Sequence, residues 1–202
     1  MHPIFQVFCN NNNGMHQVST FYKSSKETVA YLGHTVQVEY DPGSIVVFDG
    51  KPYDFKQFHF HTPSEHHVDG ITYPLEMHMV HTCAHRETDT DKPQYLVISI
   101  LFKEGEENEF LNEFLSEIPT TEGEVFELPD KFVDVDDLLD HRVDNFYYYL
   151  GSLTTPPFTE SVNWSILKKI YEASPEQIRK INLLEGNNAR HIQAIYGRKI
   201  DG

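Results

Sequence analysis

The sequence has little cysteine, few basic residues and no long apolar run, and each shortage excludes a class of protein. Only two of its 202 residues are cysteines, Cys9 and Cys83, so neither a disulfide framework nor a cysteine-based metal site is expected. The two could pair only if the fold brings them together, and we expect free thiols. No apolar segment approaches the roughly 20 residues needed to cross a bilayer, so no membrane span is expected.

Basic residues are outnumbered by acidic ones. Sixteen Lys and Arg against 31 Asp and Glu give a formal net charge of −15. Such a surface repels phosphate backbones and anionic lipids, so nucleic acid is not expected as a partner. The acidic runs at residues 104–109 and 134–140 are interpreted as solvated faces. Without a linker or an internal repeat, the chain is expected to form one domain over residues 1–202.

Short runs of β-branched and aromatic residues predict a mainly β fold. Between residues 28 and 60 these runs alternate with turn sequences at residues 41–43, 49–50 and 51–52. Residues 95–102 are apolar almost throughout, which predicts a central strand that is buried on both faces.

Helical patterns are few. In residues 106–118 apolar side chains recur every three to four positions and Pro119 ends the pattern, which predicts a short amphipathic helix. Residues 174–184 begin with a capping box that has proline at the first helical position. The expected domain is therefore mainly β with a few short peripheral helices.

Three histidines lie in two strand-like runs. His59 and His61 alternate with Phe58 and Phe60 in residues 57–61, so both imidazoles share one face of the strand. His78 lies in a second run. If the two strands are neighbours, three imidazoles converge and leave a fourth position open, as in a catalytic rather than a structural zinc site.

Residues beside the histidines support this interpretation. Two histidines on an alternating strand also occur by chance, so the hypothesis depends on the third histidine and on its surroundings. Gln57 precedes His59 by two residues and Glu76 precedes His78 by two. Each could accept the second ring N–H of a ligand and so fix its orientation, from the same strand or across to a neighbour.

Together with motifs elsewhere, these runs resemble the α-class carbonic anhydrases of bacterial type. The resemblance extends over nearly the whole chain from Pro3 onward. It rests on residues 33–39, 57–66, 76–81, 151–157 and 188–193 and on Trp164. It implies the fold of that class, one domain built on a large, twisted, mostly antiparallel central sheet. It also implies a zinc lyase, sensitive to sulfonamides, that reversibly hydrates carbon dioxide to bicarbonate and a proton through zinc-bound hydroxide.

The resemblance further implies a role for each matching residue. His59, His61 and His78 would bind Zn²⁺, which in this class lowers the pKa of its bound water to about 7, a value that belongs to the class. Three neutral imidazoles leave the ion its full charge, which favours hydroxide over water. Thr154 would donate its proton to Glu65 and so offer only an acceptor to the hydroxide.

Further roles concern the proton and the substrate. His34 matches the histidine that relays the proton to buffer, a task that suits an ordinary imidazole with a pKa of about 6.5. Thr155 would help to hold bicarbonate, and the carbonyl of Asn188 would brace His61. The apolar wall for carbon dioxide would consist of Val80, Val97, Leu153, Val162 and Trp164.

The chain departs from the class in three places. Residues 1–4 match a run that, in the class, follows a leading N-terminal segment, so that segment is expected to be missing. Its absence would leave an apolar patch open to a second copy in a homodimer. Phe158 replaces a cysteine that bacterial members often bridge, so the usual disulfide is not expected. Leu32 replaces an asparagine, which is expected to disturb the water chain that leads to His34.

The resemblance suggests a periplasmic or secreted protein. The chain has no recognisable signal peptide, however, because residues 1–8 lack a basic region and a long apolar core. The missing disulfide also weakens the inference of an oxidising compartment, so a cytoplasmic location stays open.

Two other functions stay open. One is a catalytically weak or silent binding module with the same fold, although such relatives typically lack one or more ligand histidines and all three are present here. The other is an unrelated β-sheet metalloprotein, such as a cupin-like iron dioxygenase. It would need a carboxylate or a fourth histidine as ligand, and only Glu65 and Glu76 are nearby.

Overall fold

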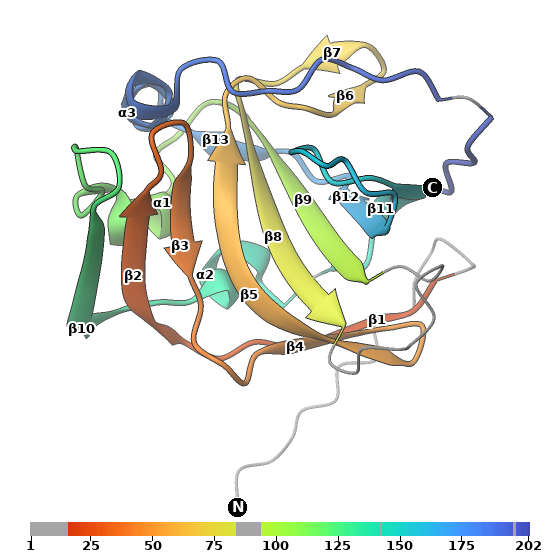
Figure 1. The fold of residues 1–202 in the computed structure, drawn as a ribbon, viewed down its shortest axis with the longest axis horizontal. Helices are drawn as coiled ribbons and strands as arrows, with labels where there is room; N and C mark the ends of the chain where they lie inside the picture. The colour runs from red at the N-terminus through yellow and green to blue at the C-terminus, as the bar shows by residue number, and fades with distance from the viewer. Residues whose placement is uncertain (1–15, 84–93, 142, 196) are drawn as a thin grey trace, which may run out of the picture.

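The computed structural model describes residues 16–83, 94–141, 143–195 and 197–202, most of which form or connect strands (Figure 1). The helices of this part are α1 (Glu109–Leu115), α2 (Val135–Leu139) and α3 (Pro175–Glu185). The strands are β1 (Val18–Phe21), β2 (Ser25–Tyr31), β3 (Val36–Glu39), β4 (Ile45–Phe48), β5 (Lys51–His61), β6 (His67–Val68), β7 (Ile71–Thr72), β8 (Leu75–Cys83), β9 (Tyr95–Glu104), β10 (Val125–Val133), β11 (Phe146–Gly151), β12 (Val162–Leu167) and β13 (Tyr171–Ala173).

One large twisted sheet dominates the molecule. Its 11 strands follow the order β10-β2-β3-β5-β8-β9-β12-β11, with β1, β4 and β13 paired beside this path and β6-β7 forming a separate hairpin. Strand β9 is parallel to β12 and β13. The other pairings of the described strands are antiparallel. The predicted fold class, a mainly β protein with a mostly antiparallel sheet and short helices, is confirmed.

The burial of the central strand β9 explains its apolar sequence. It lies between β8 and β12, and residues 96–102 are all buried. A strand covered on both faces has no polar side, which is why its apolar residues are continuous. The prediction of a break at residues 51–52 was wrong, because β5 begins at Lys51 and Pro52 pairs with Val47 of β4. Proline is tolerated there because it lies at the start of the strand.

Helix α1 covers the face of the sheet opposite to the histidines of β5. Phe58 and Phe60 are fully buried, and their rings lie 5.4 Å and 5.7 Å from the ring of Phe114. The helix is shorter than predicted, because Asn108 caps it by accepting a hydrogen bond from the Leu111 N–H. Helix α3 has the predicted capping box and runs to Glu185.

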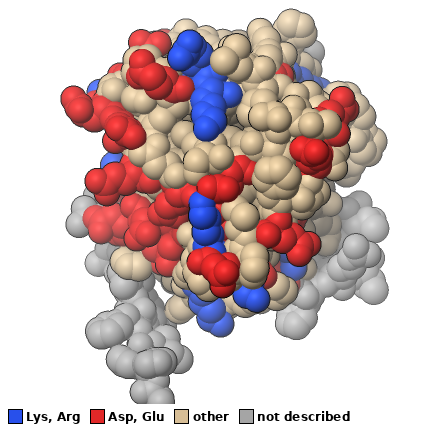
Figure 2. All heavy atoms as spheres, turned by 90° about the vertical axis from the view of Figure 1, so that its left-hand side faces the viewer, with Lys and Arg blue, Asp and Glu red and all other residues tan. Residues whose placement is uncertain are grey.

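Helix α2 was not predicted. The acidic run at residues 134–140 was interpreted as a solvated face, yet Val135 and Leu139 are fully buried and Asp134 caps the helix. Short helices with few apolar positions give a weak periodic signal. Acidic side chains nevertheless crowd the side of the molecule that carries β10 and β2, as Figure 2 shows.

Several predictions concern residues outside the described part. Cys9 lies there, so the expectation for the two cysteines stays a prediction, as does the interpretation of residues 1–8. Among the described residues, no helix is both long and apolar enough to span a membrane.

Candidate metal centre

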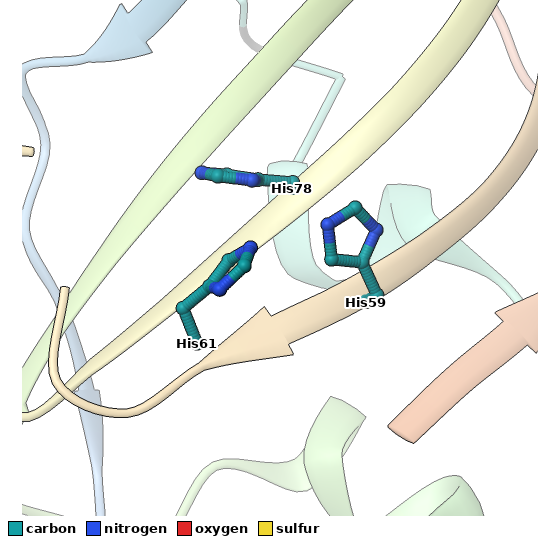
Figure 3. Close-up of side chains that lie close together, drawn as sticks. All are labelled: His59, His61 and His78. Atoms are coloured by element: carbon teal, nitrogen blue, oxygen red, sulfur yellow. The ribbon is translucent and has the colours of Figure 1, made fainter. Parts of the chain in front are cut away.

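Strands β5 and β8 bring three histidines together. In their antiparallel register His59 lies directly opposite His78, and His61 follows His59 by two residues on the same face. The ring centroids are 5.1 Å apart for His59 and His61, 5.3 Å for His59 and His78, and 4.6 Å for His61 and His78. One nitrogen of each ring lies within 4.8 Å of the others, and Figure 3 shows the rings turned toward a common centre.

Two neighbouring side chains determine which ring nitrogens face this centre. His59 Nδ1–H donates to Gln57 Oε1 at 2.9 Å, and His78 Nε2–H donates to Glu76 Oε1 at 2.7 Å. Amide and carboxylate oxygens only accept, so Nε2 of His59 and Nδ1 of His78 keep a free lone pair. Each brace comes from the ligand's own strand, two residues earlier.

Glu76 is the most heavily bonded group of the site. It is fully buried, and its Oε1 also accepts from His66 Nδ1 at 2.6 Å and from Ser99 Oγ at 2.5 Å. Its Oε2 accepts from the N–H groups of Glu65 and His66, at 2.7 Å and 2.9 Å. Burial alone would raise the pKa of Glu76, but the charges and hydrogen bonds of His66 and His78 hold it well below its usual value. Glu76 therefore stays anionic.

His61 has unused ring nitrogens. It is 4% exposed, and within the described structure neither of its nitrogens has a hydrogen-bond partner. Glu65 Oε2, 3.5 Å from His61 Nε2, is likewise buried without a partner. Buried polar atoms are rarely left unpaired, so the orphaned ring nitrogens of His61 fit a centre that is completed by a metal ion.

Burial also keeps the imidazoles in the form that binds metals. Desolvation, with a smaller contribution from the neighbouring histidines, lowers the pKa of His59 well below its usual value and that of His61 to about 4. Both rings are therefore neutral at physiological pH, as a metal ligand must be. Three imidazoles are a donor set suited to zinc and to other metals that prefer nitrogen.

A cavity of about 350 Å³ opens beside the three histidines. Its floor is one row of side chains across the sheet, because the register places Gln57 opposite Val80, Val80 opposite Val97, and Val97 opposite Trp164. The expected residues that line it are His34, Gln57, His59, His61, His78, Val80, Val97, Leu153, Thr154, Thr155 and Trp164.

One expected wall residue is not among the lining residues, and three lining residues were not expected. Val162 is 1% exposed and belongs to the same buried cluster as Val97 and Trp164. Leu32, which was expected to disturb the water chain that leads to His34, also lines the cavity. The lining residues that the sequence did not suggest are Thr35, Gln37 and Tyr95. Gln37 lies opposite His59 in the β3–β5 register, so knowledge of that pairing would have found it.

Asn188 does not bind His61 in this structure. Its Oδ1 accepts from the Thr62 N–H at 3.0 Å, and its Nδ2 donates to Phe60 O at 3.1 Å. Both bonds hold the backbone on either side of His61, so the residue braces the end of β5 rather than the imidazole. Nδ2 also donates to His34 O at 2.9 Å, while the His34 side chain is exposed at the cavity.

Thr154 and Glu65 are placed near the site but are not bonded to each other in the described structure. Glu65 Oε1 accepts from the Arg190 N–H at 2.8 Å, whereas its Oε2 has no hydrogen-bond partner. The guanidinium of Arg190 donates to Ser152 Oγ at 3.3 Å, close to Thr154 in the chain. Arg190 therefore links Glu65 to the segment that carries Thr154, a connection that sequence spacing alone did not reveal.

Comparison with known proteins gives a consistent result. Residues 6–201 match the model of the "Eukaryotic-type carbonic anhydrase" family. A carbonic anhydrase of Neisseria gonorrhoeae is 38% identical over 181 residues, which cover 89% of this chain and 68% of that protein. One of a Nostoc species is 37% identical over 83% of this chain and 61% of its own length.

A solved structure shows the same similarity in three dimensions. The α-carbonic anhydrase of Thermovibrio ammonificans, determined in complex with the inhibitor sulfanilamide, superposes with a TM-score of 0.80 at 38% identity. The match covers 91% of this chain and 77% of that one.

Proposed function

Because the chain belongs to the eukaryotic-type carbonic anhydrase family, we propose that it reversibly hydrates carbon dioxide at a zinc ion held by His59, His61 and His78. The observation that carries the proposal is the convergence of three imidazoles, two buried and one partly buried, beside a partly apolar cavity. Zinc in such a site supplies a hydroxide nucleophile at neutral pH, because it lowers the pKa of a coordinated water to about 7, for which carbonic anhydrase is itself the standard case.

Gln57 and Glu76 orient two of the three ligands. By accepting Nδ1–H of His59 and Nε2–H of His78, they leave the opposite nitrogens free for the metal. The negative charge of Glu76 also makes the free nitrogen of His78 a stronger electron-pair donor to the metal. Asn188 keeps the end of β5, and with it His61, in place through the backbone of Phe60 and Thr62.

The apolar side of the cavity binds carbon dioxide. This substrate is small and has no net dipole, so it is held by contact with hydrocarbon surface rather than by hydrogen bonds. Val80, Val97, Leu153 and Trp164 supply that surface, and Val162 belongs to the same buried cluster as Val97 and Trp164. The same side chains keep surplus water away from the carbon atom that is attacked.

Thr154 and Glu65 select the protonation state of the nucleophile. We assign to Thr154 a hydrogen bond to the unused Oε2 of Glu65, which commits the only proton of its hydroxyl group. The threonine oxygen can then only accept, so it favours a nucleophile that still carries a proton. Thr155, which lines the same cavity, helps to hold bicarbonate.

His34 exports the proton that each turnover releases. Its side chain is exposed and lines the cavity, so it can exchange with buffer on one side and with cavity water on the other. An imidazole changes its charge in the physiological pH range, which suits it to a relay.

The other two functions have less support. A silent module does not need three ligand histidines with their braces, and all of these are in place. An iron dioxygenase would need a further carboxylate or histidine ligand. Glu65 is not part of the group formed by His59, His61 and His78, and both oxygens of Glu76 are already occupied by hydrogen bonds.

One experiment separates these functions. Purified protein is analysed for metals, and its carbon dioxide hydration is followed by stopped flow with and without sulfanilamide. We expect one zinc ion per chain and hydration that the sulfonamide inhibits. Full zinc without hydration would favour the silent module, and iron would favour the dioxygenase. Homodimer formation and cellular location stay predictions.

A further inference from the structure

Glu185 is a buried carboxyl group that the proposed reaction does not use. It is the last residue of α3 and is 6% exposed. Its Oε1 accepts from the Val36 N–H at 2.7 Å, and its Oε2 accepts from Asn188 Nδ2 at 3.2 Å. Among the described residues no basic side chain forms an ion pair with it. Burial raises the pKa of Glu185 to about 8, so the group is retained at an energetic cost.

Both partners of Glu185 hold the segment that carries His34. Val36 is the first residue of β3, two positions after His34. Asn188 Nδ2, the same group that donates to Glu185, also donates to the carbonyl of His34 at 2.9 Å. The carboxyl group therefore contacts this segment directly at Val36 and indirectly, through Asn188, at His34.

A third contact connects the end of α3 with the same segment. The Tyr31 hydroxyl lies 2.8 Å from Leu184 O and 3.1 Å from Gly33 O, so it can donate to either. Residues 31–36 are thus fastened to the C-terminal end of α3 at several points.

Asn188 also contacts the strand that carries two of the metal ligands. Its Oδ1 and Nδ2 bind the backbone of Thr62 and Phe60, the two neighbours of His61 in the chain. A short series of hydrogen bonds, from Val36 through Glu185 and Asn188 to the end of β5, therefore connects the His34 segment with the strand that carries two metal ligands.

We propose that Glu185 is a positioning residue for proton transfer, whose two oxygens hold residues 33–36 so that the imidazole of His34 stays at the cavity. This inference rests on the proposed function, because it assigns His34 to the proton relay. The two hydrogens of Asn188 Nδ2 are shared among Glu185 Oε2, His34 O and Phe60 O, whereas the Val36 N–H has Glu185 as its acceptor. An apolar residue at this position would leave the buried Val36 N–H unpaired and would remove one of the three acceptors around Asn188 Nδ2.

The test uses the order of events in the reaction. In the proposed reaction bicarbonate leaves before the proton does, so kcat/KM would contain no proton export, whereas kcat in weak buffer would. For Glu185→Leu we expect kcat in weak buffer to fall about 10–100-fold, because a misplacement of a catalytic group by about 1 Å can cost about a hundredfold. We expect kcat/KM to stay within about twofold, and added imidazole buffer to restore kcat. Glu185→Gln keeps an acceptor for Val36 and should lose less.

Two controls tie the effect to His34. Glu176 is an exposed glutamate of the same helix, and Glu176→Leu should leave both rate parameters unchanged. In the double variant of Glu185→Leu and His34→Ala, the loss of kcat should not exceed that of His34→Ala alone, because both act on one step.

The contact between Glu185 and Val36 can also be tested in the metal-free protein, without an activity assay. Amide hydrogen exchange at Val36 should be faster in Glu185→Leu than in the wild type, with Glu185→Gln in between. The proposal fails if kcat and kcat/KM fall together at every buffer concentration, or if the losses in the double variant multiply. It also fails if Val36 exchange is unchanged. A wild type without hydration activity would instead overturn the proposed function, and the exchange result would still report on the contact.

Discussion

Replacing Glu76 by glutamine removes one charge from the centre of the site without changing the shape of the side chain. The carboxylate accepts from five donors, three at Oε1 and two at Oε2. A glutamine has one acceptor oxygen and turns the other atom into a donor. Whichever way the amide lies, at least two of the five donors then face an NH₂ group.

The size of the effect follows from this count. A buried donor that loses its acceptor costs about 1–3 kcal/mol, so two such losses reduce the stability of the metal-free protein by about 2–6 kcal/mol. If the amide NH₂ faces His78, the ring is driven to carry its proton on Nδ1, the nitrogen assigned to the metal. Loss of a hydrogen-bonding partner of a metal-binding histidine typically weakens metal affinity by about 10–100-fold.

Two assays measure these effects separately. Urea denaturation of metal-free protein gives the free energy of unfolding, and competition with a chromophoric chelator gives the zinc affinity. Glu106→Gln, at an exposed glutamate, is the matched control and should leave both unchanged. If Glu76→Gln bound zinc within twofold of the wild type and unfolded at the same urea concentration, Glu76 would not brace the site as described.

Three further predictions follow from individual residues. Thr154→Val should lower kcat/KM about 100-fold while zinc stays bound, because it removes one oriented hydrogen-bonding group beside the reacting atoms, and stopped flow combined with metal analysis checks this. His34→Ala should slow turnover in weak buffer and recover with imidazole; equal rates at every buffer strength would exclude it from the relay. Burial raises the pKa of Glu27 from 4.5 to about 7, so the folded protein favours the protonated carboxyl group over the charged one. The folded protein is therefore at its most stable, as far as Glu27 is concerned, below pH 4.5, and this stability is lost as the pH rises through 7. Glu27→Gln should therefore be more stable than the wild type at pH 8 and equal to it at pH 4, by urea denaturation.

Local patterns in the sequence predicted the elements that carry the ligands. The alternation of His59 and His61 with two phenylalanines places both imidazoles on one face, and the structure has that arrangement with the phenylalanines in the core. The capping box of α3 and the continuous apolar run of β9 were equally informative. In each case the physical cause lies within a few residues of chain.

Features that depend on distant pairing could not be predicted in this way. Gln37 and Tyr95 enter the cavity because of the register of β3 on β5 and the position of β9, which no short stretch of sequence encodes. The bond from the Arg190 N–H to Glu65 joins residues 125 positions apart. Val162 was assigned to the cavity wall, but it is buried in the same cluster as Val97 and Trp164 and is not among the residues that line the cavity.

The proposed activity depends on one metal ion bound by three imidazoles with a fourth position free for solvent. X-ray absorption at the zinc edge of the purified protein measures this directly. We expect three nitrogen ligands with the signature of imidazole and one light-atom ligand, all at about 2.0–2.1 Å, with no sulfur. When sulfanilamide is added, the light-atom ligand should be replaced while the three imidazoles remain. A spectrum with fewer than three imidazoles, or with a protein carboxylate or thiolate as the fourth ligand, would contradict the central claim.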